Sequence, residues 1–296
     1  MNKSSWIEAL GKPSYDFSYS GMKFVKRYEY PGIAVEMYLQ PNGPETVQRV
    51  LVAIAEDAKK PCPAVVVPYY YPEAMLGFDP ETGEKEGFNK DKAIMEHLVR
   101  RGYIAISAQS YHLTYIDSDL DINDFSRWTV AAEKLKKDNP GWSGVGKLVS
   151  DTRLLIDALC DDERVDSQRI GIIGHSLGGK MAFYTGCLDE RIKAIVASDF
   201  GIGWEQTNWK DIWYWGEYVD ELKLKGMEHS QLLGIESKPF CLIAGEADND
   251  DSWDMMNRAQ GYKENDGKLK IINHATGHNP PRYTLEEAYD FLDKWL

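Results

Sequence analysis

One pentapeptide near the middle of the chain places a serine between two glycines in the spacing G-x-S-x-G. It is Gly174-His-Ser-Leu-Gly178, with Ser176 at its centre. A serine held on a sharp strand-to-helix turn needs neighbours without a Cβ two residues away on either side, because side chains there would clash with the turning backbone. The apolar run 169–173 predicts the strand, and the residues from Leu177 onward predict the helix. The pattern predicts a nucleophilic serine, and a glycine-rich turn with a helix-capping serine is the alternative.

A serine hydroxyl is a poor nucleophile at neutral pH, so it needs a base, and the base needs an acid that orients it. The chain has six histidines, which are His97, His112, His175, His229, His274 and His278. The first four lie in a predicted helix, in polar segments or in the pentapeptide itself. His274 directly follows a predicted strand, which favours a structural role. His278 follows Gly277 in the loop before the last predicted helix, so we expect it to reach back over Ser176 as the base.

The acid is expected in the loop after the predicted strand 239–244, because catalytic groups collect beyond the carboxyl ends of strands in open α/β sheets. Asp248 is the preferred residue, since it lies a few positions past the end of that strand. The rivals are Glu246, Asp250 and Asp251 in the same loop, and Asp199 after the preceding strand. A run of acidic residues is more often a solvated surface than a site.

Negative charge that develops on a substrate oxygen needs preformed hydrogen-bond donors. The backbone N–H of Leu177, the residue after the serine, is the first expected donor. The second should come from the loop after the apolar run 64–67, where the chain reads Pro-Tyr-Tyr-Tyr-Pro. A backbone N–H of Tyr70 or Tyr71 would serve, and a tyrosine hydroxyl is the alternative.

The elements that must position these residues alternate along the chain. The predicted strands are 23–30, 33–39, 47–55, 64–67, 103–107, 169–173, 192–198, 239–244 and 269–273. The predicted helices are 89–101, 127–137, 146–159, 253–262 and 284–296, and one short helix is expected in an N-terminal arm, 1–21. The first three strands alternate polar and apolar residues, which favours antiparallel pairing. The later order predicts the α/β class, with a mostly parallel, doubly wound sheet covered by helices on both faces.

Composition limits the class of partner. The chain has 296 residues with a formal net charge of −13, so nucleic acid and anionic membranes would repel it. No run is long enough to span a bilayer, and the first residues carry no secretory signal. The four cysteines are scattered without C-x-x-C spacing, which favours free thiols in a reducing compartment and excludes a disulfide frame or a zinc site. We therefore expect a cytoplasmic protein that binds a small molecule, and the oligomeric state stays open.

With these residues in place, the chain resembles a serine hydrolase of the α/β-hydrolase superfamily, and within it the branch of dienelactone hydrolases and acetylxylan esterases. The resemblance covers roughly residues 45–296. The residues that carry it are Gly174–Gly179, Ala244–Asp248 and Gly277-His278, with 151–159 and 189–194. It implies two-step acyl transfer, with neither a metal nor an organic cofactor. Because the sequence shows no internal repeat, low-complexity linker or clear break in composition, we expect one α/β-hydrolase domain over residues 1–296.

This chain differs from dienelactone hydrolases in its expected nucleophile, which is a cysteine in those enzymes and Ser176 here. Ser176 therefore favours hydrolysis of carboxylic esters with short acyl groups, acetylated carbohydrates among them. Three other readings stay open. These are a peptidase of the prolyl-oligopeptidase type, a thioesterase, and a hydrolase-fold receptor that binds a ligand without lasting turnover.

Two insertions, 109–145 and 200–236, are expected near the active site. The second carries four tryptophans between residues 204 and 215, and such an insertion often forms a lid or a pocket wall in this superfamily. Trp204, Trp209 and Trp213, together with His175, are the candidate substrate contacts, because aromatic rings stack on sugars or line acyl pockets. The alternative is that the tryptophans only pack the insertion onto the sheet.

Overall fold

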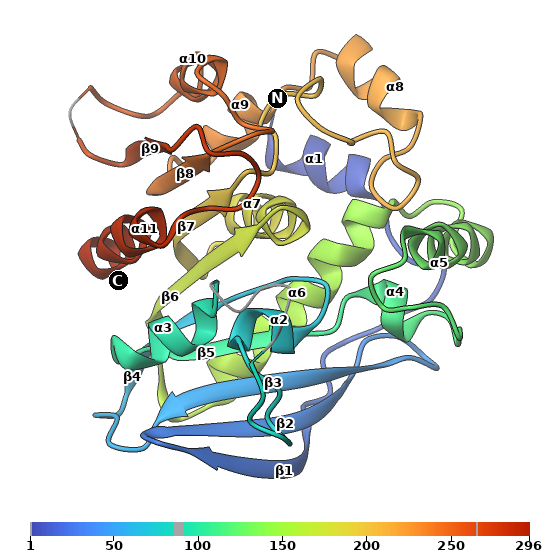
Figure 1. The fold of residues 1–296 in the computed structure, drawn as a ribbon. Coiled ribbons are helices and arrows are strands. Elements are labelled where there is room, and N and C mark those ends of the chain that lie inside the picture. Colours follow the sequence, from blue (N-terminus) through green and yellow to red (C-terminus); the bar gives the residue numbers. More distant parts are fainter. Residues whose placement is uncertain (1, 86–91, 265) are drawn as a thin grey trace.

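The computed structural model describes residues 2–85, 92–264 and 266–296, and a sheet of nine strands runs through it in the order β1-β2-β3-β5-β4-β6-β7-β8-β9 (Figure 1). The strands are β1 Lys23–Tyr30, β2 Ile33–Pro41, β3 Val47–Ala55, β4 Cys62–Val66, β5 Ile104–Ala108, β6 Val165–His175, β7 Ile192–Ser198, β8 Phe240–Ala244 and β9 Leu269–Asn273. All nine predicted strands are present, and four of them have the predicted bounds.

The pairing of the strands follows the pattern of their sequences. β1, β2 and β3 are antiparallel to one another, and β3 is antiparallel to β5. From β5 to β9 all neighbouring strands are parallel. β5 and β8 are buried at every residue, and β6 is buried from Ile170 onward, because helices cover both faces of the sheet there. Their carboxyl ends meet at one edge of the sheet, and that edge holds the elbow and the acidic loops.

Helices cover both faces of this sheet. They are α1 Lys3–Leu10, α2 Pro72–Leu76, α3 Ile94–Arg100, α4 Tyr111–Thr114, α5 Phe125–Asp138, α6 Gly144–Asp161, α7 Leu177–Leu188, α8 Tyr218–Leu224, α9 His229–Leu233, α10 Asp251–Asn257 and α11 Arg282–Trp295. One core packs α1, α5, α6 and α7 on one face, and a second core packs α2, α3 and α11 on the other. The predicted helix 89–101 is shorter than expected at its start, and its residues 89–91 lie outside the described residues.

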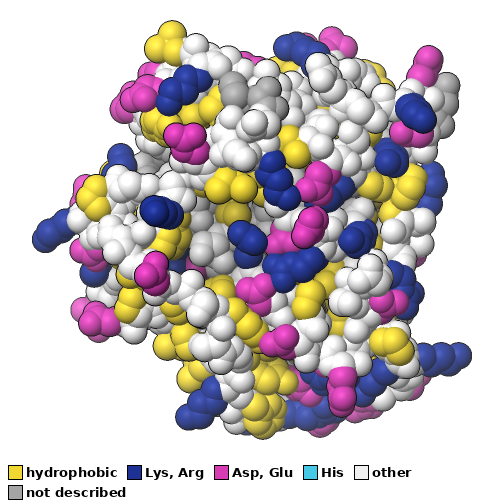
Figure 2. Space-filling model, turned by 180° about the vertical axis from the view of Figure 1, so that it is seen from behind, with side chains coloured by type: hydrophobic (Ala, Val, Ile, Leu, Met, Phe, Trp, Pro, Cys, Tyr) yellow, Lys and Arg dark blue, Asp and Glu magenta, His cyan; other side chains and the backbone are white. Residues whose placement is uncertain are grey.

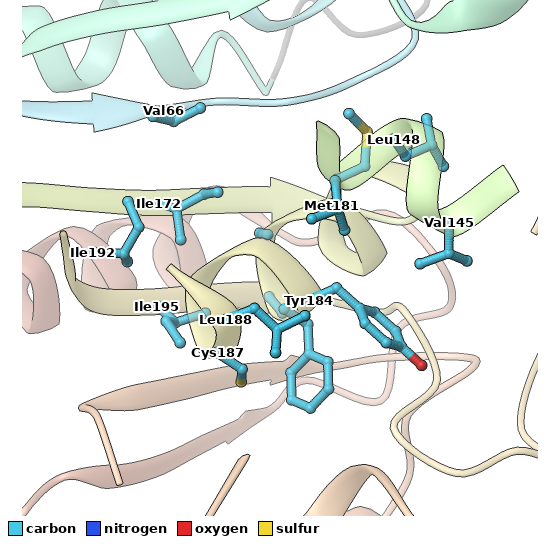
Figure 3. Packing of buried hydrophobic residues seen from close by; sticks show 14 of the residues in the cluster. Val66, Val145, Leu148, Ile172, Met181, Tyr184, Cys187, Leu188, Ile192 and Ile195 are labelled. Atoms are coloured by element: carbon cyan, nitrogen blue, oxygen red, sulfur yellow. The ribbon is translucent and has the colours of Figure 1, made fainter. Parts of the chain in front are cut away.

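Helix α7, which follows the elbow, is the most buried helix of the fold. Figure 3 shows Met181, Tyr184 and Leu188 of α7 among the side chains of the sheet and of α6. Gly186 lets the helix approach the sheet closely, because a Cβ there would lie 2.6 Å from Cγ1 of Ile195. Such packing on both sides fixes the direction in which the helix begins.

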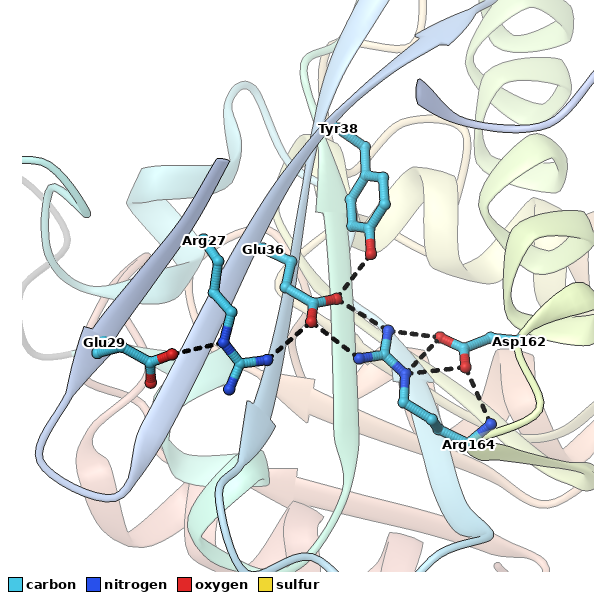
Figure 4. A network of polar contacts seen from close by, with 6 residues as sticks. All are labelled: Arg27, Glu29, Glu36, Tyr38, Asp162 and Arg164. Carbon is cyan, nitrogen blue, oxygen red and sulfur yellow. Dashed lines mark hydrogen bonds and ion pairs between the residues drawn. The ribbon is translucent and has the colours of Figure 1, made fainter. Parts of the chain in front are cut away.

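A polar network ties β2 to the turn before β6 (Figure 4). Glu36 accepts hydrogen bonds from both terminal nitrogens of Arg164 at 3.0 and 2.9 Å, and from the hydroxyl of Tyr38 at 2.7 Å. Although burial alone would raise the pKa of Glu36, these donors hold it below its usual value. The network joins the antiparallel end of the sheet to the strand that carries the elbow.

Figure 2 shows acidic and basic side chains interspersed on the face opposite to that of Figure 1. Among the residues that the structure describes, no helix has both the length and the apolar character needed to cross a membrane.

Candidate active site

Ser176 lies on a sharp turn between the end of β6 and the start of α7. Its φ of 55° is a conformation that residues other than glycine rarely adopt. A Cβ on Gly174 would come within 2.0 Å of the carbonyl oxygen of Gly178, and a Cβ on Gly178 within 2.1 Å of that of Pro68. Both glycines of the pentapeptide are therefore required sterically. The backbone N–H of Ser176 is fixed by a 2.8 Å hydrogen bond to the carbonyl of Ser198 on β7.

His278 follows β9 and Gly277, whose φ is 92°. Its Nδ1 forms a short hydrogen bond with Oδ2 of Asp199, and its side chain is 42% exposed. The ring lies 4.7 Å from that of His175, the residue next to the serine in the elbow. The structure thus brings His278 beside the elbow from a position about a hundred residues further along the chain.

The carboxylate that meets His278 is that of Asp199, and this corrects the prediction of Asp248. Asp199 follows β7, is 1% exposed, and contacts Nδ1 of His278 through Oδ2. Asp248 is fully buried, and both of its carboxylate oxygens face backbone N–H groups of residues 200–202. Asp199 is one of the rival acids in the sequence, because it directly follows a strand. In the structure this strand, β7, pairs with the elbow strand β6.

The other predicted acids lie on the surface. Glu246, Asp250 and Asp251 are exposed, and Asp250 accepts a 2.5 Å hydrogen bond from the side-chain amide of Asn273. His274 is 7% exposed and pairs its Nδ1 with the hydroxyl of Thr276 at 2.6 Å.

His175 is buried beside the serine. Its Nδ1 lies 3.1 Å from the hydroxyl of Ser198, and its ring stacks with that of Tyr69 at 6.4 Å. Burial lowers its pKa well below the usual value, so the ring is neutral at pH 7. A neutral, packed imidazole forms a wall against which the ring of His278 rests.

The loop after β4 lies directly against the elbow, because the carbonyl of Pro68 approaches Gly178. Leu177 begins α7, and the first N–H groups of a helix have no partner within the helix. Tyr70 is held in this loop, since its carbonyl accepts hydrogen bonds from the N–H and the hydroxyl of Ser110 at 3.0 and 3.2 Å. Burial, and then the charge of Asp211, raise the pKa of Tyr70 to about 12, so its hydroxyl keeps its proton at pH 7.

The side chain of Tyr71, the other predicted donor residue, turns to a different place. It lines a cavity of about 440 Å³ together with Arg49 and Glu73, which form an ion pair. Tyr71 also precedes α2 as its N-cap. The backbone N–H of either tyrosine stays a predicted donor to the oxyanion.

The tryptophan-rich insertion packs mostly into the core, which corrects the expectation for two of its rings. Trp204 is 6% exposed, Trp209 is fully buried, and their Nε1 atoms donate to the carbonyls of Met227 and Gly201. Neither ring offers a face on which a sugar could stack. Trp213 is partly exposed, and it stacks against Phe125 of α5 with ring centroids 6.0 Å apart.

Sequence reasoning missed Lys180, which lies one helical turn after the serine. Its ammonium group lies 4.9 Å from the ring of Trp209 and 4.8 Å from that of Tyr214, and 3.3 Å from the side-chain oxygen of Asn208. Burial lowers its pKa to about 7. The available signal was the position of a lysine on the same helix face as the serine, since residues i and i+4 are neighbours on a helix.

The elbow and the order of the strands define an α/β-hydrolase. The chain belongs to the dienelactone hydrolase family, whose model matches residues 50–212. The model of the prolyl oligopeptidase family matches residues 144–296.

Individual relatives are distant in sequence and similar in fold. The curated relative named "Putative hydrolase YtaP" from Bacillus subtilis (strain 168) is 24% identical over 89% of this chain and 88% of its own. A CE15 glucuronoyl esterase from Teredinibacter turnerae T7901 superposes with a TM-score of 0.68 at 17% identity, covering 99% of this chain and 86% of its own. An acetyl xylan esterase from Paenibacillus sp. R4 has a TM-score of 0.64 at 15% identity, covering 93% of this chain and 88% of its own.

Proposed function

We propose that the protein is a serine esterase that hydrolyses carboxylic esters through Ser176, His278 and Asp199. The observation that carries the proposal is the hydrogen bond between Nδ1 of His278 and Asp199, at a histidine that lies beside the strained elbow of Ser176. A buried carboxylate on Nδ1 leaves Nε2 as the nitrogen that accepts a proton.

The reaction would proceed in two acyl-transfer steps. Oγ of Ser176 attacks the carbonyl carbon of the ester, and Nε2 of His278 takes the proton of the hydroxyl. The tetrahedral intermediate collapses, the bond to the alcohol oxygen breaks, and His278 protonates that oxygen. Water then repeats the sequence on the acyl-enzyme and releases the carboxylic acid. Asp199 stabilises the charged imidazole in both steps.

The oxyanion of each intermediate would be bound by two donors. The N–H of Leu177 is the first, because it opens helix α7 at the positive end of the helix dipole. The second comes from the loop after β4, through the backbone N–H of Tyr70 or Tyr71 or through the protonated hydroxyl of Tyr70. The contact of Pro68 with Gly178 supports this pairing, since it holds the loop after β4 against the elbow.

Short acyl esters are the proposed substrates, with acetylated carbohydrates among them. Of the three tryptophans named as candidates, the burial of Trp204 and Trp209 leaves Trp213 with an accessible surface, so we retain it as a candidate sugar contact. Uronic acid esters are the second class to assay, because one of the similar structures is a glucuronoyl esterase.

Hydrolysis of p-nitrophenyl acetate, butyrate and octanoate by the wild type, Ser176→Ala and His278→Ala tests the proposal. We expect a preference for acetate and a loss of several orders of magnitude in kcat for either variant. A wild type that is inert on all three esters, or a Ser176→Ala variant that keeps its activity, would refute it.

A peptidase is the second candidate, and the observation that favours it is the match of residues 144–296 to the prolyl oligopeptidase family. Release of p-nitroaniline from aminoacyl-proline anilides, compared with hydrolysis of the corresponding esters, separates the two activities. Turnover of the anilides at a rate similar to that of the esters would favour the peptidase.

A further inference from the structure

The loops after β7 and β8 each hold the acidic side chain of the other. Asp248, in the loop after β8, accepts hydrogen bonds from the N–H groups of Phe200 and Gly201 at 2.8 and 2.9 Å and from that of Ile202 at 2.8 Å. Asp199, at the end of β7, accepts hydrogen bonds from the N–H groups of Ala247 and Asp248 at 2.7 and 3.1 Å. β7 and β8 are parallel neighbours, so the two loops leave the sheet side by side.

The conformation of Asp199 shows why such support is needed. Its φ is 44°, in a region that residues other than glycine rarely adopt, so the surrounding structure must hold it. After it, three successive N–H groups of residues 200–202 converge on one carboxylate. Without an acceptor these buried donors would be unpaired, and the backbone would rearrange.

Asp248 meets this requirement with its two carboxylate oxygens. It is fully buried, and its Oδ1 accepts a further hydrogen bond from the hydroxyl of Ser252 at 3.2 Å. Burial raises the pKa of Asp248, while the three backbone donors favour its charged form. An asparagine at this position would have one acceptor oxygen, and its amide nitrogen would face at least one backbone N–H.

We propose that Asp248 is a positioning residue for the esterase reaction, because its hold on the backbone of residues 200–202 keeps Asp199 against His278. The inference rests on the proposed function, in which Asp199 is the acid that orients the base. Asp248 itself acts only through the backbone that follows Asp199.

The test compares the esterase kcat and KM of the variants with those of the wild type. Among the described residues, the structure places Asp199 at Nδ1 of His278 and the ring of His175 beside it. A displaced Asp199 leaves substrate binding intact but weakens the orientation of the base, so kcat should fall while KM stays near its wild-type value.

Asp248→Asn is expected to lower kcat on the order of 10²-fold, with little change in KM, because a small displacement of an orienting group has an effect of this size. Asp199→Asn should show a larger loss, and Ser252→Ala a smaller one, since Ser252 supplies one of the four donors to Asp248.

Asp189→Asn is the matched control. Asp189 is a buried carboxylate at the other end of β7, where it pairs with Arg191 at 2.7 Å. We expect this variant to lower the melting temperature while kcat and KM stay unchanged. A merely structural role for Asp248 would produce the same pattern in Asp248→Asn, and that result would overturn the inference.

Failure of the inference and failure of the proposed function give different results. A loss of kcat in Asp248→Asn that equals or exceeds the loss in Asp199→Asn would make Asp248 the orienting acid and overturn the inference.

If the wild type hydrolyses no ester, the proposed function fails, and the Nδ1 proton resonance of His278 becomes the readout. Its displacement in Asp248→Asn, with no displacement in Asp189→Asn, would support the positioning role without turnover, and an unchanged resonance would refute it.

Discussion

Asp199 contacts Nδ1 of His278, although the tryptophan-rich insertion and the strands β8 and β9 lie between the two residues in the chain. This contact fixes the tautomer of the imidazole, because a carboxylate on Nδ1 keeps the proton there. Asp199→Asn offers an amide whose nitrogen can donate to Nδ1 and so favour the wrong tautomer. We expect kcat on p-nitrophenyl acetate to fall on the order of 10⁴-fold at neutral pH. A loss below tenfold, with the fold intact by circular dichroism, would remove Asp199 from the mechanism.

The elbow should tolerate no side chain at Gly178. A Cβ there would lie 2.1 Å from the carbonyl oxygen of Pro68, so Gly178→Ala must displace either the helix or the loop after β4. We expect a loss of about 1–3 kcal/mol or more in the free energy of unfolding, because the surrounding core is closely packed. Urea denaturation measures it.

Gly141→Ala is the control for this change, since nothing lies within 4 Å of a Cβ at Gly141. Its effect should stay within about 0.5 kcal/mol. Equal effects of the two alanines would contradict the steric account of the pentapeptide.

The buried ion pair of Lys147 and Asp151 should be costly to break. The two side chains are 0% and 4% exposed, and they lie 2.6 Å apart on helix α6. Lys147→Met leaves Asp151 buried without its partner, so we expect the free energy of unfolding to fall by about 3–5 kcal/mol. Lys134→Met, which removes a half-exposed lysine paired with Asp138, should change it by about 0.5 kcal/mol or less.

The effect of Lys147→Met should depend on pH. Burial already raises the pKa of Asp151 to about 6, above its value in the unfolded chain, so its contribution to stability is present at low pH and is lost as the pH rises through 6. Removing Lys147 raises this pKa further. The destabilisation measured by urea should therefore be larger at pH 8 than at pH 5, and the reverse order would contradict the assignment.

Lys180 should make stability rise with pH. Its pKa is about 7 in the folded protein and 10.5 in a model peptide, so the unfolded chain binds the extra proton between these values and folding becomes more favourable as the pH rises. Lys180→Met should flatten this slope, while the exposed Lys134→Met should not. Unfolding free energies at pH 7.5 and 9.5 measure this slope. Equal slopes in the wild type and Lys180→Met would contradict the lowered pKa of Lys180.

Much of the architecture was determined by local patterns. Continuous apolar runs predicted the later strands, because burial on two faces leaves a direct trace in the sequence. The antiparallel pairing of β1 to β3 was predicted from alternation, although β3 is buried on both faces over residues 50–54. The elbow was equally clear, since the steric demand at Ser176 acts within five residues. His278 could be predicted because few histidines compete for its position.

Only the tertiary structure decided which carboxylate meets that histidine. Asp199 and Asp248 both follow strands at the same edge of the sheet, and the sequence offers nothing that ranks two acids so placed. The choice depends on where backbone N–H groups converge, and three of them converge on Asp248. The tertiary structure also decided the environment of Trp204 and Trp209. Whether these rings face a ligand or the core depends on packing between segments that are distant in the chain. Contacts between residues far apart in the chain leave no periodic signal, so they appear only when the chain is folded.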